Sequence, residues 1–167
     1  MDEQRLGLAL ARWREAGHAL PRIWTKAGTL VRQEADTALP VPPDAARDAG
    51  GRTLVSDYTA EGARLSFAES VARLGLDPSA TKGPTLAGLR IHDCPTDQVD
   101  IALSSDGMLA GLRELRSEGK IGHVSLGMNA NLVAADILRL VRGAPAGTFD
   151  TLLLAGGYNL LCQVLCP

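Results

Sequence analysis

The strongest constraint on the fold is the alternation of helical and strand-like segments along the chain. Four segments with helical periodicity each precede a short apolar or β-branched run, so the predicted order is helix then strand, repeated four times. Helices of roughly a dozen residues between buried strands are typical of crossover connections in a parallel sheet. The sequence therefore predicts an α/β fold with about four parallel βα units. The strands are expected at residues 22–28, 89–92, 121–127 and 149–154.

The helices are recognised by an apolar face and by the residues at their ends. The first is expected over residues 2–17. The second is expected between Thr59, a favourable N-cap, and Gly75, a favourable C-cap. The other two are expected over residues 105–118 and 131–143, the last with Asn131 as its N-cap and Gly143 at its end.

Two stretches do not have the pattern of a regular element. Residues 29–58 contain the segment ALPVPPDAARDAGG, in which three prolines and a Gly-Gly pair exclude a continuous helix or strand. A loop of this length inside a compact domain is usually either functional or disordered. A second irregular stretch, residues 77–88, leads into the predicted strand at residues 89–92.

Composition excludes several classes of function. The formal net charge is −2 and there is no basic run, which argues against a nucleic-acid partner. No apolar stretch reaches the ~20 residues of a membrane span. The three cysteines, Cys94, Cys162 and Cys166, fit neither a disulfide framework nor a metal site. Because the N-terminus lacks the charged region of a signal peptide, we expect a reducing, cytoplasmic compartment.

Polar side chains close two of the predicted strands. His92 and Asp93 end the apolar run of GLRIHDCP, and Lys26 ends the run of RIWTKAG. The C-terminal ends of parallel strands are where α/β proteins place catalytic and binding groups. A solvated lysine and a polar turn are also common after strands. The residues alone leave a catalytic and a structural interpretation open.

Five segments follow one another along the chain: RIWTKAG, DYTAEGARLSFAESVARLGL, RIHD, LRELRSEGKIGHVSLGMN and FDTLLLAGGYNLL. In sequence and order they resemble the aldo/keto reductases, and most of all the sugar dehydrogenases that act on L-fucose, D-threo-aldoses or galactose. The family fold is a (β/α)₈ TIM barrel of ~250 residues or more. The resemblance implies one domain, residues 1–167, that forms a partial barrel containing the family's third to sixth strands. It would be truncated at both ends relative to the family.

The resemblance also implies roles for four residues. Lys26 matches the lysine that lowers the pKa of the family's catalytic tyrosine, and His92 matches the histidine that orients the carbonyl group. Gly127 and Asn129 match cofactor-binding positions of the family. Asn129 matches the residue that binds the nicotinamide carboxamide. The family's catalytic Tyr and Asp have no match here. Tyr58 is interpreted as a packing and capping residue, and no metal is expected.

The resemblance implies hydride transfer between NAD or NADP and a small-molecule sugar or carbonyl substrate, with oxidation of an aldose as the expected reaction. For an aldose this reaction would give a lactone. Two alternatives stay open: a truncated, catalytically inactive paralogue that acts as a binding or assembly module, and an independent small α/β domain. A partial barrel also leaves open sheet edges, through which homo-oligomers can form.

Overall fold

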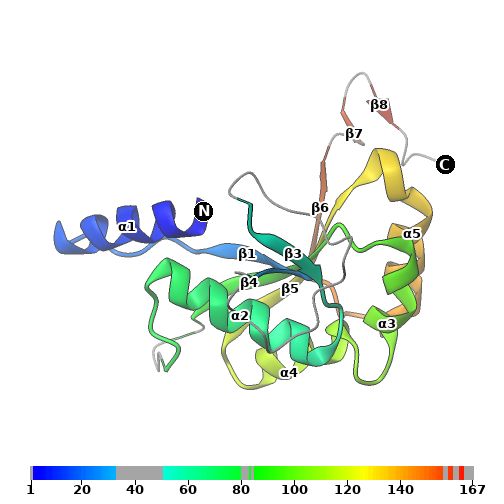
Figure 1. Cartoon of the computed structure of the whole chain (residues 1–167), viewed down its shortest axis with the longest axis horizontal. Helices are drawn as coiled ribbons and strands as arrows, with labels where there is room; N and C mark the ends of the chain where they lie inside the picture. Colours follow the sequence, from blue (N-terminus) through cyan, green and yellow to red (C-terminus); the bar gives the residue numbers. More distant parts are fainter. Residues whose placement is uncertain are drawn as a thin grey trace.

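The centre of the molecule is a four-stranded sheet with the order β1-β4-β5-β6, and all its neighbouring strands are parallel (Figure 1). The computed structural model describes residues 2–32, 51–79, 83, 85–155, 158–159 and 162–163. The four strands are β1 (Trp24–Ala27), β4 (Leu86–His92), β5 (Ile121–Asn129) and β6 (Thr151–Ala155). They confirm the predicted α/β class and each of the four predicted strands.

The longer helices also follow the prediction. They are α1 (Asp2–Glu15), α2 (Ala60–Leu74), α4 (Met108–Ser117) and α5 (Ala130–Gly143). The predicted caps of α2 are confirmed, since the Thr59 hydroxyl accepts a hydrogen bond from the Gly62 N–H at 3.1 Å. At the other end Gly75 has a left-handed backbone with φ of 64°.

Two helix starts differ from the prediction. A 3₁₀ turn, η1 (Thr96–Gln98), and a short helix, α3 (Val99–Leu103), precede α4. The hydroxyl of Ser104 donates to Asp106, so a turn replaces the first residues of the predicted helix. The N-cap of α5 is Asn129, and the prediction of Asn131 was wrong. The reason is that β5 runs directly into α5 with no intervening loop.

Part of the stretch predicted to be irregular is an antiparallel hairpin. The strands β2 (Thr29–Arg32) and β3 (Thr53–Ser56) pair with each other, because both are short β-branched runs on either side of the proline-rich segment. Residues 33–50 lie outside the described residues. A second small pair, β7 (Tyr158–Asn159) and β8 (Cys162–Gln163), was also not predicted. The strand β4 begins at Leu86, within the second irregular stretch.

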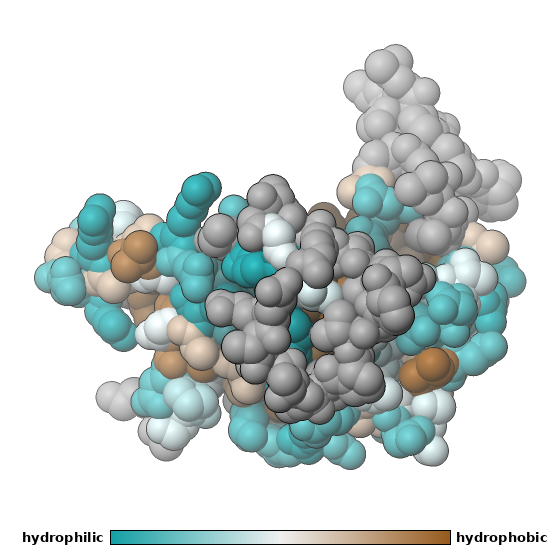
Figure 2. Space-filling view, in the orientation of Figure 1, coloured by the Kyte–Doolittle hydropathy of each residue, from teal (hydrophilic) through white to brown (hydrophobic). Residues whose placement is uncertain are grey.

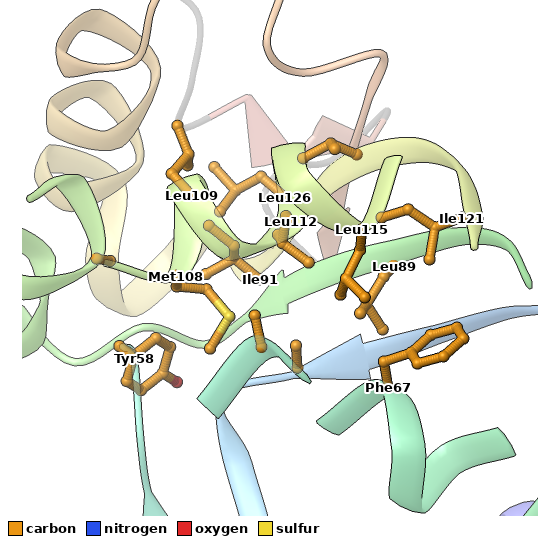
Figure 3. Packing of buried hydrophobic residues seen from close by; sticks show 14 of the residues in the cluster. Tyr58, Phe67, Leu89, Ile91, Met108, Leu109, Leu112, Leu115, Ile121 and Leu126 are labelled. Atoms are coloured by element: carbon orange, nitrogen blue, oxygen red, sulfur yellow. The ribbon is translucent and has the colours of Figure 1, made fainter. Parts of the chain in front are cut away.

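The hydrophobic core lies between the sheet and helices α2 and α4. Successive side chains of a strand point to opposite faces, so alternate residues of β4 and β5 face these helices. These residues are Leu89, Ile91, Val124 and Leu126, all with 0% exposure. Figure 3 shows Leu112 and Leu115 of α4 directed toward them, with Phe67 of α2 nearby. Burial of each such side chain stabilises the fold by about 1.5–3 kcal/mol.

A partly buried carboxylate attaches α1 to the rest of the domain. Glu3 accepts hydrogen bonds from Thr25 of β1 and from two residues of α2, Ser70 at 2.9 Å and Arg73 at 2.7 Å. Burial alone would raise the pKa of Glu3, but these hydrogen bonds outweigh it and hold the pKa below its usual value. The outer surface of α1 carries both hydrophilic and hydrophobic residues (Figure 2). Leu8 and Trp13 of this helix are exposed.

Candidate active site

The face of the sheet opposite to α2 and α4 carries polar and charged side chains. Lys26 of β1 is in register with Arg90 of β4, and Arg90 is in register with Ser125 of β5. His92 follows Arg90 by two residues, so it lies on the same face, opposite Gly127. The structure thus brings Lys26 and His92 to the C-terminal ends of adjacent parallel strands, as the sequence predicted.

Lys26 and His92 are electrostatically linked. Lys26 is exposed and has no hydrogen bond or ion pair with any other described residue. Burial lowers the pKa of His92, and the positive charge of Lys26 lowers it further, whereas the carboxylate of Asp93 opposes this shift. The net effect favours the neutral imidazole of His92 near neutral pH.

Asp93 joins the ends of β4 and β5. Its Oδ1 atom accepts a hydrogen bond from the backbone N–H of Asn129 at 3.0 Å, and its own N–H donates to the Gly127 carbonyl at 3.0 Å. Its Oδ2 atom is 3.5 Å from Nε2 of His92. The backbone φ of Asp93 is +41°, a conformation that aspartate tolerates better than most residues. Asp93 is therefore a bridge between strand ends that also contacts the imidazole.

Tyr58 is hydrogen-bonded to the C-terminal end of β4. It is 1% exposed, and its hydroxyl donates a hydrogen bond to the His92 carbonyl at 2.6 Å. Burial raises the pKa of Tyr58 strongly, and the nearby Cys94 and Asp93 raise it further. A Cβ atom at Gly28 would lie only 2.5 Å from the Tyr58 ring, so the ring packs where a side chain would otherwise be. Gly28 also has a φ of +119°, which favours glycine. The packing role predicted for Tyr58 is confirmed.

Of the two predicted cofactor-binding residues, Asn129 is accessible and Gly127 is covered. Asn129 is exposed, and its side-chain N–H lies 3.4 Å from Oδ2 of Asp93. Gly127 is buried, and a Cβ atom there would lie 3.2 Å from Cδ of Arg90 and 3.7 Å from Cδ2 of His92. The missing side chain of Gly127 therefore makes room for Arg90 and His92.

An aromatic and charged layer lies at the other end of the same face. Trp24 stacks on His123 with ring centroids 5.5 Å apart, and it passes over Gly88, where any side chain would clash. The guanidinium carbon of Arg90 lies 4.4 Å from the centre of the Trp24 ring. Nε2 of His123 is 3.0 Å from a guanidinium nitrogen of Arg22. Sequence reasoning missed this layer, because these residues meet only across the sheet.

Two cavities lie near the N-terminal ends of the strands, away from Lys26 and His92. One of about 490 Å³ is lined by Arg22, Trp24, His123, Asp150 and Thr151. Another, of about 580 Å³, lies between the end of α1 and the start of β4.

Among the described residues no cluster of His, Cys, Asp or Glu side chains could hold a metal. No helix in these ranges combines the length and apolar character needed to cross a bilayer.

The fold is an α/β fold with a parallel sheet and polar residues at its strand ends. Comparison with known proteins shows which class of α/β protein it resembles. The chain is 31% identical over 176 residues to a D-threo-aldose 1-dehydrogenase from a Pseudomonas species. The match covers 98% of this chain and 45% of that protein. The chain thus spans less than half the length of the curated relative it matches. No family model matches the sequence.

Solved structures give the same result for the fold. A putative aldo-keto reductase from Pseudomonas aeruginosa superposes with a TM-score of 0.56 and 23% identity, over 95% of this chain and 46% of that one. A glycerol dehydrogenase from Gluconobacter oxydans superposes with a TM-score of 0.55 and 17% identity, over 91% of this chain and 36% of that one. The sequence and structural matches confirm the resemblance to the aldo/keto reductases and the partial-barrel fold.

Proposed function

We propose that this chain forms part of the active site of an NAD(P)-dependent oxidoreductase of the aldo/keto reductase type, with an aldose as substrate. The observation that carries the proposal is the placement of Lys26 and His92 on one face, at the ends of adjacent parallel strands. The similarity to a D-threo-aldose 1-dehydrogenase supports an aldose substrate. Oxidation at the anomeric carbon would convert it to a lactone.

His92 orients the reacting oxygen in this proposal. A neutral imidazole donates one N–H and keeps an acceptor on its other nitrogen, so it can hydrogen-bond to a carbonyl or hydroxyl oxygen without giving up a proton. The lowered pKa of His92 favours this form. Tyr58 fixes the backbone of His92, and Asp93 lies beside its ring. The first contact fixes the backbone that carries the imidazole, and the second places a carboxylate next to its Nε2 atom.

Lys26 supplies a positive charge beside the reacting centre. An ammonium group favours the ionised form of a neighbouring phenol, and this helps a tyrosine to exchange a proton near neutral pH. Tyr58 does not serve as that tyrosine, because it is buried and donates its hydroxyl hydrogen to the His92 carbonyl. The proposal therefore requires a tyrosine other than Tyr58 as the acid/base group.

The described residues fit a nicotinamide cofactor in part. Asn129 would hold its carboxamide, since this side chain is exposed at the end of the strand next to His92. Gly127 does not fit a close approach to the cofactor, because the side chains of Arg90 and His92 lie next to it. When bound, such a cofactor supplies the hydride acceptor for oxidation.

Titration of the purified chain with NADPH and with NADH tests the proposal. Trp24 lies two residues from Lys26, so its fluorescence should report on binding, and Trp13→Phe removes the second tryptophan signal. We expect saturable quenching that Asn129→Ala weakens at least tenfold, while Arg113→Gln, a change at an exposed residue of α4 on the other side of the sheet, leaves it unchanged. A flat titration on a folded sample would contradict the proposal and favour the inactive binding module.

A further inference from the structure

The middle of the polar sheet face carries two cations that have no anionic partner among the described residues. Lys26 and Arg90 are register partners on neighbouring strands, which lie roughly 4.8 Å apart in a sheet. Like charges directly opposite each other on one face destabilise strand pairing. Within the described residues neither side chain is paired with a carboxylate. Among the described residues, the positive charge of this pair is therefore not balanced.

Arg90 also has an unsatisfied hydrogen-bond donor. Its Nε atom is buried and has no hydrogen-bond partner among the described residues. The guanidinium group rests on the Trp24 ring, which holds one of its faces and restricts its position. A planar guanidinium with free donors is suited to two parallel hydrogen bonds from a carboxylate or a phosphate.

Polar groups continue the same row across the sheet. Ser125 is the register partner of Arg90, and Thr151 is the register partner of Ser125. Their hydroxyl groups are hydrogen-bonded to each other at 2.9 Å. Asp93 is already engaged by Asn129 and lies beside His92, and Asp150, near His123, is paired with Arg116. Nothing in the row competes with an incoming anion for Lys26 or Arg90.

We propose that Lys26 and Arg90 form a binding site for the carboxylate or phosphate group of a small molecule. Arg90 and His92 are neighbours on the same face of β4, two residues apart. An anion held by Lys26 and Arg90 would therefore place the rest of the ligand against the imidazole. Assigning this anion to a substrate rests on the function proposed above, and would make the substrate an acidic sugar derivative. The anion site itself does not rest on it.

The test is a titration of the full chain with inorganic phosphate, without cofactor, at constant ionic strength. The Nε–H signal of Arg90 in ¹H–¹⁵N spectra, assigned by its loss in Arg90→Gln, reports on the site directly. We expect a saturable shift of this signal. We also expect binding, measured by calorimetry, to weaken at least tenfold in both Arg90→Gln and Lys26→Gln. Arg113→Gln removes the same charge from an exposed arginine of α4 and should leave binding unchanged.

Three outcomes would overturn the site: a shift that is linear in phosphate, an equal loss in Arg113→Gln, or unchanged binding in Arg90→Gln. Circular dichroism of each variant shows whether it is folded, and a rise in the melting temperature of the unmodified chain with phosphate gives an independent readout. A parallel titration with acetate separates a carboxylate site from a phosphate site. Phosphate binding without cofactor binding would leave this site standing and remove only the proposed enzyme function.

Discussion

The two faces of strands β4 and β5 differ as much as any two regions of the molecule, although their residues alternate along the same segments. One face presents Leu89, Ile91 and Leu126 to the helices, each fully buried. The other presents Arg90 and His92, which are only partly buried and carry the proposed chemistry. Because the two sets of side chains never touch, substitutions on the first face should act on stability and those on the second on binding.

The largest effect is expected from a cavity on the helix-facing side. Leu126→Ala should lower the free energy of unfolding by about 2–5 kcal/mol, because a fully buried leucine loses its contacts and leaves a void. Urea unfolding followed by circular dichroism measures this. Leu138→Ala is the matched control, since Leu138 of α5 is 47% exposed and its truncation should have a far smaller effect. Equal losses in the two variants would mean that the core is not packed as described.

A smaller effect is expected where the two faces meet, at the end of β4. Tyr58→Phe keeps the ring beside Gly28 but removes the hydrogen bond to the His92 carbonyl. The loss should lower the free energy of unfolding by about 1–2 kcal/mol, because the partly buried His92 carbonyl loses this donor. The His92 imidazole signals should also broaden or shift in NMR spectra. Unchanged stability together with unchanged His92 signals would show that Tyr58 does not position this strand end.

The polar face should make stability depend on pH. The pKa of His92 is lower in the folded chain than in the unfolded chain, so the unfolded chain binds more protons as the solution is acidified. The stabilising contribution of neutral His92 is therefore complete above the unfolded pKa of about 6.5 and is lost as the pH falls below that value. NMR titration of the imidazole measures the shift directly. In His92→Gln this part of the pH dependence should disappear, and its persistence would contradict the assignment.

The smallest effect on folding is expected from Lys26→Met. Lys26 is exposed and unpaired among the described residues, so the free energy of unfolding should change by no more than about 0.5 kcal/mol. Phosphate or cofactor binding should weaken in the same variant. A large loss of thermal stability would show that Lys26 is structural, and the contrast between the two faces would then fail on this strand.

Local patterns predicted much of the fold correctly. The Thr59 and Gly75 caps of α2 are local features of the chain, and both were found where the sequence placed them. The hairpin of β2 and β3 was missed, because its strands pair across the proline-rich segment that separates them. The start of α5 was misplaced by two residues, since it depends on where β5 ends and not on the helix sequence.

The candidate site shows the same division. Lys26 and His92 were found from the resemblance of their strand-end segments, and the structure places both on one face. Arg90 and its contact with Trp24 carried no signal of their own in the sequence. The reason is that Arg90 lies in a run of apolar residues, where only the register with Lys26 reveals its partner.

By itself the sequence determined the alternation of helices and strands, the parallel direction of the sheet and the polar residues at the strand ends. These properties depend on side-chain periodicity and capping, which act over a few residues. The tertiary structure alone decided which cations face each other, which tyrosine fixes His92 and which face remains polar. Those properties depend on strand register and on packing between distant segments, because a shift of one residue would turn every side chain of a strand to the opposite face.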